Sequence, residues 1–188
     1  WCAASTHKGE ETFCLKTHIN LKKDIKNLIT FIIPRHIHRS GKIKSLCEQY
    51  NLSAQILNNN ENIKSQKEII IINSFGVLSK YFKYSKSVFI GKSISRKLQN
   101  EGGQNPIEAA KYNCKIYHGP YVDNFKEIYE LLKSYKISCE INNENELSEK
   151  LKFDFKSPKN NNNTASIINN LGNKILNDSI EEINKILK

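Results

Sequence analysis

Short apolar runs that favour β-structure alternate with helical segments along most of this chain. Residues 28–33 are apolar or β-branched and stop at Pro34, and residues 87–90 end in the same way at Gly91. Between such runs, apolar side chains recur at helical spacing, as in residues 124–135. This alternation predicts an α/β fold in which a Rossmann-like parallel sheet is covered by helices on both faces.

The predicted elements follow one another in a regular order. Strands are expected at residues 1–4, 28–33, 68–72, 87–90, 115–117 and 137–141. Helices are expected at residues 9–23, 38–50, 74–84 (with Ser74 as a possible N-cap), 105–112, 124–135 and 144–151. Because ligands bind parallel sheets beyond the carboxyl ends of the strands, the candidate site loops are residues 5–10, 34–39, 73–77, 91–105 and 118–124.

The segment at residues 102–108, Gly-Gly-Gln-Asn-Pro-Ile-Glu, is the most informative part of the sequence about function. Two glycines precede Pro106, which suits the first turn of a helix, and Glu108 projects from that turn. Unpaired N–H groups at such a corner can hold a phosphate or a carboxylate, and the Glu108 carboxylate can accept hydrogen bonds from sugar hydroxyls. The alternative is a capped helix that simply follows a loop.

The chain divides at an Asn-rich stretch near its end. Residues 1–157 are predicted to form one domain, and residues 158–188 a linker and a C-terminal helix that packs against a neighbouring domain. Because the 188 residues include no Met and begin inside a predicted strand, we expect a domain cut from a longer protein. No apolar run approaches the ~20 residues that a membrane span requires.

The formal net charge of +10 comes from 29 Lys and Arg against 19 Asp and Glu. Lysines alternate with Asn and Glu, and no recognisable nucleic-acid-binding module accompanies them, so nucleic acid is not an expected partner. An anionic membrane surface is a better candidate, because a diffuse positive field is enough to attract it. Anionic small molecules are also compatible with the charge.

The cysteines are odd in number and far apart. They are Cys2, Cys14, Cys47, Cys114 and Cys139, and none forms a Cys-x-x-Cys pair. No set of His, Cys and carboxylate residues has metal-ligand spacing, so neither a zinc site nor a disulfide framework is expected. Thiols in a reducing compartment, the cytosol, are the expected state.

Four motifs occur in one order along the chain. They are residues 4–11 (Ala-Ser-Thr-His-Lys-Gly-Glu-Glu), residues 34–36 (Pro-Arg-His), residues 102–108, and Gly119-Pro120 followed by Asn124-Phe125. Together they resemble the C-terminal half of the 3-deoxy-D-manno-octulosonic acid (Kdo) transferases, which make the inner core of lipopolysaccharide in Gram-negative bacteria. Each motif alone is weak, and the resemblance depends on the ordered set.

This resemblance implies the C-terminal domain of an inverting glycosyltransferase of the two-domain GT-B type. In that family the domain binds the donor, CMP-Kdo, while the N-terminal domain binds the lipid A precursor, lipid IVA, and supplies the catalytic base. It implies no cofactor and no metal. It also implies that the full-length protein acts at the cytoplasmic face of the bacterial inner membrane, and that this segment is a soluble, cytosolic domain that is inactive alone.

The resemblance further predicts which residues bind the nucleotide sugar. They are Ser5, Thr6, His7, Arg35, His36, Gly76, Gly102, Gly103, Asn105 and Glu108. Helix N-termini at Gly9 and Pro106 would supply N–H groups for the CMP phosphate and the Kdo carboxylate, and Glu108 would accept the ribose hydroxyls.

Some of these residues have structural alternatives. Ser5 and Thr6 can instead be plain N-caps, and Arg35 a solvated loop residue. His38 and Arg39 are expected on a helix surface, and Asn124 is expected to lock the loop that precedes it.

Three positions depart from the family's pattern. Val77 stands where the family has an acidic residue, Lys92 lies within the family's Gly-Gly-Ser stretch, and Gln104 replaces a histidine. A second hypothesis therefore stays open, in which the chain is a nucleotide-binding or interaction module that has kept the fold and lost catalysis.

Overall fold

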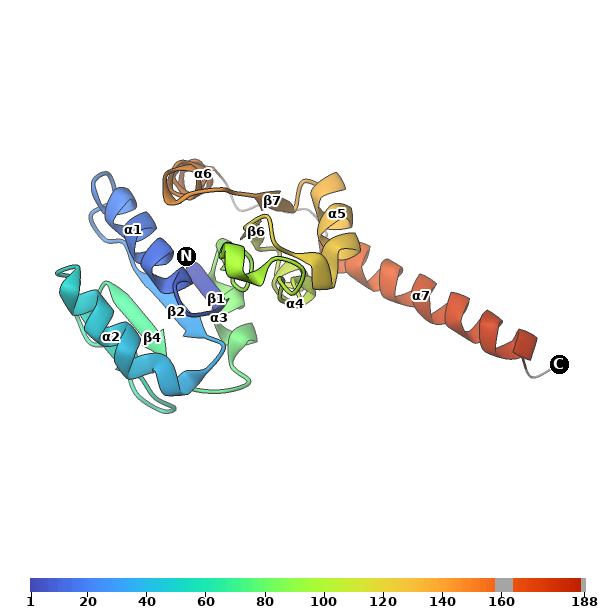
Figure 1. Ribbon diagram of the computed structural model, residues 1–188, viewed down its shortest axis with the longest axis horizontal. Coiled ribbons are helices and arrows are strands. Elements are labelled where there is room, and N and C mark those ends of the chain that lie inside the picture. The colour runs from blue at the N-terminus through green and yellow to red at the C-terminus, as the bar shows by residue number, and fades with distance from the viewer. Residues whose placement is uncertain (158–163, 187–188) are drawn as a thin grey trace.

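The computed structural model describes residues 1–157 and 164–186, which form an α/β body and a long C-terminal helix (Figure 1). The sheet has seven strands in the order β3-β4-β2-β1-β5-β6-β7, and every neighbouring pair is parallel. The strands are β1 (Cys2–Thr6), β2 (Thr30–Pro34), β3 (Ala54–Leu57), β4 (Ile69–Ile72), β5 (Ser87–Ile90), β6 (Lys115–His118) and β7 (Ser138–Glu140).

Helices follow most of the strands. They are α1 (Glu10–Lys22), α2 (Ser40–Gln49), α3 (Leu78–Tyr84), α4 (Ile107–Lys111), α5 (Lys126–Ser134), α6 (Glu144–Lys156) and α7 (Thr164–Ile186). Three short 3-10 turns also occur, at Ile37–Arg39, Arg96–Leu98 and Asp123–Phe125. The sequence prediction of a Rossmann-like parallel sheet with a C-terminal helix is confirmed.

Both faces of the sheet are buried, and β1 shows how. Cys2 and Ala4 point to the face where Phe82 of α3 and Leu132 of α5 pack, whereas Ala3 points to the opposite face, toward Phe13 of α1. Because alternate side chains meet helices on both sides, the strands read as nearly continuous apolar runs. This explains why the apolar runs predict the central strands well.

The order of the strands reverses between β1 and β5. From β1 the chain passes to β2 and then to the edge strand β3, and it returns to insert β4 between β2 and β3. It then crosses to place β5 on the other side of β1. The loops that leave the carboxyl ends of β1 and β5 therefore turn in opposite directions, which is where doubly wound sheets bind ligands. The 5–10 and 91–105 loops lie at this point.

Two predictions about local structure are wrong. Strand β3 was not expected, because Ala54–Leu57 is short and includes the polar Gln55. Helix α3 begins at Leu78 instead of Ser74, so Ser74 is not its N-cap. Phe75 is 70% exposed and Gly76 has a φ of 69°, which a right-handed helix does not accommodate.

Helix α7 extends away from the α/β body (Figure 1). Its first turns contact α4, and Ile168 joins the core beside α4 and α5. Farther along, Leu176, Ile180 and Ile183 are exposed on it. Among the described residues no helix is both long and apolar enough to cross a membrane. The predicted linker at residues 158–163 lies outside the described residues, and the predicted domain boundary stays a prediction.

Candidate functional site

The candidate site occupies the carboxyl edge of the sheet at the switch point. Its centre is Glu10, whose side chain is fully buried at the start of α1. One carboxylate oxygen, Oε2, accepts hydrogen bonds from the backbone N–H groups of His7 (2.9 Å) and Lys92 (2.7 Å). The other, Oε1, accepts from Ser93 (2.8 Å) and Ile94 (3.2 Å). One side chain thus satisfies four backbone donors and joins the β1 loop to the β5 loop.

The loop after β1 holds three of the predicted residues. Ser5 has a φ of 55°, in the left-handed region, and the next residue, Thr6, is fully buried. The Thr6 hydroxyl has no hydrogen-bond partner among the described residues. Gly9 precedes α1 with a φ of 97°, and no side chain caps this helix. Neither Ser5 nor Thr6 is therefore its N-cap, which removes the structural alternative for both residues.

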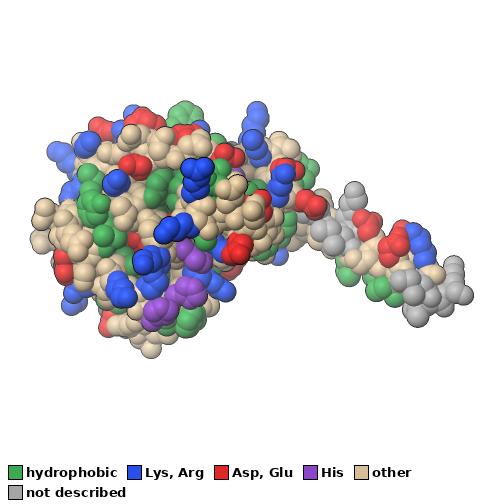
Figure 2. All heavy atoms as spheres, in the orientation of Figure 1, with side chains coloured by type: hydrophobic (Ala, Val, Ile, Leu, Met, Phe, Trp, Pro, Cys, Tyr) green, Lys and Arg blue, Asp and Glu red, His purple; other side chains and the backbone are tan. Residues whose placement is uncertain are grey.

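Histidines gather beside this loop. The rings of His7 and His36 make an edge-on contact at 5.8 Å between centroids, and His38 lies 5.7 Å from His36. Figure 2 shows the histidine side chains in one patch beside Lys and Arg side chains. Burial lowers the pKa of His7, although the Ser5 carbonyl and Glu10 partly oppose that shift. Because the Ser5 carbonyl can only accept, His7 Nδ1 donates to it over 3.1 Å, which leaves Nε2 of the neutral ring as an acceptor.

The loop after β2 lies against the loop after β1. The backbone N–H of Arg35 donates to the Thr6 carbonyl at 3.0 Å, while the Arg35 side chain is exposed. Ser5, Arg35 and Gly76 line one cavity of about 60 Å³. The structure therefore brings together the predicted residues of three loops, those that follow β1, β2 and β4.

An ion pair that sequence reasoning missed supports these loops. The guanidinium of Arg39 donates two hydrogen bonds to the Glu11 carboxylate in a bidentate ion pair, with N–O distances of 2.7 and 2.8 Å. The Glu11 side chain is 2% exposed and that of Arg39 is 15% exposed. The expectation that Arg39 is a helix-surface residue is wrong. Its charge fixes the first turn of α1 against the start of α2.

The Gly102-Gly103 corner packs tightly on the loop after β6. A Cβ atom on Gly102 would lie 2.2 Å from the Tyr121 carbonyl oxygen, and Gly103 has a φ of 96°. The backbone N–H of Gly103 donates to the Lys92 carbonyl at 2.5 Å, which links this corner to the switch point. Only glycine fits at these positions, because one lacks space and the other has a left-handed backbone.

Two asparagines order the same corner. Asn124 donates from its backbone to the Gly102 carbonyl (3.1 Å) and from its side chain to the Glu101 carbonyl (2.8 Å), so it does lock the loops together. The Asn105 side-chain oxygen accepts from the Ile107 N–H at 2.9 Å, at the beginning of α4. Glu108 follows on that helix with an exposed side chain, and none of the described residues bonds to its carboxylate.

The three departures from the family pattern lie in loops at this edge, and all three residues are partly exposed. Val77 lines the small cavity together with Ser5 and Gly76. Lys92 has a φ of 59° and gives its backbone N–H to Glu10, so its backbone role is fixed. The Gln104 carbonyl accepts from the Tyr129 hydroxyl at 2.9 Å. Within the described part of the chain, no group of three His, Cys, Asp or Glu side chains is arranged to hold a metal ion.

Comparison with known proteins gives a consistent result. No protein-family model matches the chain. A 3-deoxy-D-manno-octulosonic acid transferase of Haemophilus influenzae is 30% identical over 142 residues, which are 76% of this chain and 32% of that protein. The enzyme of the same name from Rickettsia felis is 29% identical over 191 residues, 98% of this chain and 40% of that protein. The chain thus spans well under half the length of these relatives.

A solved structure has the same fold. The crystal structure of the C-terminal CMP-Kdo binding domain of WaaA from Acinetobacter baumannii matches with a TM-score of 0.75 and 20% sequence identity. The match covers 89% of this chain and 83% of that one. The resemblance that the ordered motifs indicated is confirmed by these relatives.

Proposed function

We propose that this chain, a relative of the 3-deoxy-D-manno-octulosonic acid transferases, is the part of such an enzyme that binds the nucleotide-sugar donor, CMP-Kdo. The observation that carries the proposal is the switch point itself. There the buried Glu10 carboxylate orders the two loops that diverge from β1 and β5. These loops carry predicted donor-binding residues, among them His7, which donates to Glu10, and Gly103, which donates to the Lys92 carbonyl. The sequence relatives and the similar solved domain support the same assignment.

Negative charge on the donor has suitable partners at this edge. CMP-Kdo carries a phosphate and a carboxylate, and the N-terminus of α1 has no side-chain cap to compete with an anion. Arg35 is exposed beside it, and Lys92 lies within the β5 loop. Because CMP is the leaving group, donors placed in advance stabilise the charge that develops on its phosphate.

Hydroxyl groups of the donor have acceptors at the same edge. The Nε2 atom of neutral His7 accepts hydrogen bonds, so it suits a sugar hydroxyl better than an anionic oxygen. Glu108 is exposed and unengaged on α4, and it suits the two ribose hydroxyls. The buried Thr6 hydroxyl can both donate and accept, and a bound ligand would give it the partner it lacks.

The activity of the whole enzyme belongs to the same proposal. We infer that the full-length protein transfers Kdo to a lipid A precursor, lipid IVA, at the cytoplasmic face of the inner membrane, without a cofactor or a metal. The catalytic base and the acceptor site would come from an N-terminal domain. The exposed stripe of Leu176, Ile180 and Ile183 on α7 would pack against that domain.

A second candidate function is a module that has kept the fold without catalysis. Val77 is the observation that favours it, because an apolar side chain now lines the small cavity beside Ser5 and Gly76. A carboxylate there would bind hydroxyl or amino groups that valine cannot bind. The two candidates differ in one measurable property, since only the donor-binding domain should recognise CMP.

The site is tested by mapping the binding of CMP on the amide resonances of the isotope-labelled chain. The proposal predicts shifts at Thr6, Lys92 and Gly103, on the carboxyl edge of the sheet. Glu108→Ala should weaken CMP binding by about 1–3 kcal/mol, whereas the control Glu127→Ala, an exposed carboxylate on α5, should not. Shifts confined to other surfaces would remove these residues from the site.

A further inference from the structure

Aromatic and basic side chains gather at the amino edge of the sheet, opposite the candidate donor site. Tyr84 is 82% exposed three residues before β5, and Tyr135 is 47% exposed three residues before β7. Phe153, in the last turn of α6, is 72% exposed. Because parallel strands begin at one edge and the helices between them return to it, these three side chains belong to the same end of the body. We call this set the aromatic edge.

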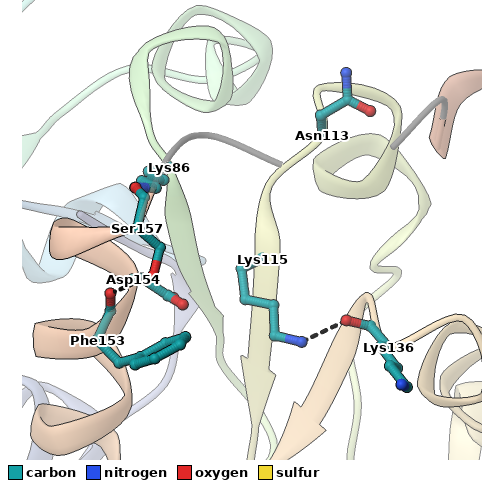
Figure 3. A pocket seen from close by; sticks show the side chains of 7 residues that line it. All are labelled: Lys86, Asn113, Lys115, Lys136, Phe153, Asp154 and Ser157. Carbon is teal, nitrogen blue, oxygen red and sulfur yellow. Dashed lines mark hydrogen bonds between the residues drawn. The ribbon is translucent and has the colours of Figure 1, made fainter. Parts of the chain in front are cut away.

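A pocket opens within the aromatic edge. It has a volume of about 410 Å³ and is lined by Lys86, Asn113, Lys115, Lys136, Phe153, Asp154 and Ser157. Figure 3 shows Lys86, Lys115 and Lys136 around the beginnings of neighbouring strands, with Phe153 and Asp154 on α6 beside them. The pocket shares no residue with the candidate donor site, so its charge has no role in the proposed binding of CMP-Kdo.

The charge of this pocket is positive in sum. Among the described residues that line it, Asp154 alone is acidic, and its carboxylate accepts hydrogen bonds from the Ser87 hydroxyl (2.6 Å) and the Tyr117 hydroxyl (2.8 Å). Lys86 donates to the Ser157 carbonyl and Lys115 to the Lys136 carbonyl. An ammonium group has three N–H donors, so each of these lysines keeps two for a ligand. The pocket therefore suits an anion with several acceptor oxygens, such as a phosphate group.

We propose that the aromatic edge docks on an anionic bilayer surface, with a lipid phosphate group in the lysine pocket and Phe153, Tyr84 and Tyr135 at the level of the headgroups. Two features favour a bilayer over a free phosphate compound. Exposed aromatic residues adjoin the lysines, since Phe153 lines the pocket, Tyr84 is two residues before Lys86 and Tyr135 directly precedes Lys136. Tyr and Phe rings partition into the membrane interface. Each lysine near an anionic membrane adds about 1 kcal/mol of attraction. This inference rests on the proposed function in one respect, namely that the acceptor substrate, a lipid A precursor, is a membrane lipid.

The docking is tested by co-sedimentation of the whole 188-residue chain with phosphatidylcholine vesicles that contain or lack phosphatidylglycerol. The chain should bind the anionic vesicles. Joint replacement of Lys86, Lys115 and Lys136 by Gln should lower the partition coefficient by more than about tenfold. The control replaces Lys42, Lys44 and Lys64, exposed lysines elsewhere, by Gln and removes the same charge. An equal loss in both variants would overturn the proposal, because a diffuse field would then explain the binding.

A second variant reports on the aromatic edge without removing charge. Phe153→Trp should show a blue-shifted emission and quenching by brominated lipids on anionic vesicles, whereas the parent chain, whose single Trp1 is 7% exposed, should not. Absence of quenching would contradict the proposal that residue 153 inserts into the bilayer interface. Binding of glycerol 3-phosphate to the pocket without binding of vesicles would overturn the docking in favour of a small ligand.

The vesicle experiment and the CMP-binding experiment test separate proposals, and either proposal can be refuted without the other. The three pocket substitutions should leave the affinity for CMP unchanged, because they lie at the opposite edge of the sheet from Glu10 and Thr6. Conversely, Glu108→Ala should leave vesicle binding unchanged. A chain that binds CMP and ignores anionic vesicles would refute the docking alone.

Discussion

The Glu10 carboxylate lies 2.8 Å from the backbone nitrogen of Ser93, a residue 83 positions farther along the chain. This contact spans the switch point, since Glu10 follows β1 and Ser93 follows β5. Ser93 in turn accepts, through its hydroxyl, the backbone N–H of Gly119 at 2.9 Å, so the β6 loop is tied to the same point. One buried carboxylate therefore sets the relative position of three loops at the candidate site.

Replacement of Glu10 by Gln should disturb this arrangement strongly. The amide nitrogen of Gln is a donor, so it would face backbone N–H groups that now donate to a carboxylate oxygen. We expect the free energy of unfolding to fall by about 2–4 kcal/mol, because buried donors lose their acceptor. Urea unfolding measures this, with the exposed Glu48→Gln as the control. Equal stability of Glu10→Gln and the parent chain would show that the four bonds are not needed.

Gly102→Ala should be costly for a steric reason. Its Cβ atom would lie 2.2 Å from the Tyr121 carbonyl oxygen, so the corner would have to move away from the β6 loop. We expect a loss of about 1–3 kcal/mol in the free energy of unfolding. Gly41→Ala is the matched control, since nothing lies within 4 Å of its Cβ position in α2, and it should gain up to about 1 kcal/mol. In thermal unfolding, the melting temperature should fall for Gly102→Ala and rise slightly or stay unchanged for Gly41→Ala. A melting temperature of Gly102→Ala equal to that of the parent chain would contradict the steric argument.

Much of the fold is readable from local sequence, whereas contacts between distant loops are not. All four residues of Ile69–Ile72 are buried, and their β-branched, apolar composition predicts a strand. Strand β3 was missed because Gln55 is polar, yet its amide is satisfied by the Asn62 carbonyl (3.0 Å) and the Lys64 N–H (2.8 Å) of the following loop. That compensation depends on the path of the loop, which periodicity does not report.

The same limit applies to the candidate site. The motif around Ser5, Thr6 and His7 could be placed at a strand end from the sequence. Glu10 could be seen only as an acidic residue in the first turn of a helix, because its partners lie more than 80 residues away. The pairing of Arg39 with Glu11 was hidden for the same reason, since 28 residues separate them.

Arg39→Ala should destabilise the chain by about 3 kcal/mol, because it leaves the buried Glu11 carboxylate without its partner. Arg39→Lys keeps the charge but loses the two-pronged geometry, so we expect a smaller loss of about 1–2 kcal/mol. The control is Lys44→Ala, which removes an exposed pair with Glu48 at 3.9 Å and should cost at most about 0.5 kcal/mol. Urea unfolding should rank the three variants in this order, and an Arg39→Ala loss no larger than the control would contradict it.

The stability of the chain should fall on mild acidification through His18. Burial lowers the pKa of His18 to about 4, although Glu68 partly opposes the shift. The unfolded chain binds a proton at this residue near its ordinary pKa of 6.5, so stability is full above that pH and is lost as the pH falls toward 4. Between about pH 7 and about pH 4.5, His18→Gln should lose about 2–3 kcal/mol less than the parent chain. Parallel losses in the parent chain and in His18→Gln would exclude His18 as the cause.

The loops held by Glu10 are proposed to form a binding site for a cytidine nucleotide. Isothermal titration of the 188-residue chain with CMP, UMP and GMP tests it most directly. We expect saturable heat with CMP, weaker binding of UMP and GMP, and loss of the CMP signal in Glu10→Gln. No heat with CMP, or equal affinity for all three nucleotides, would contradict it.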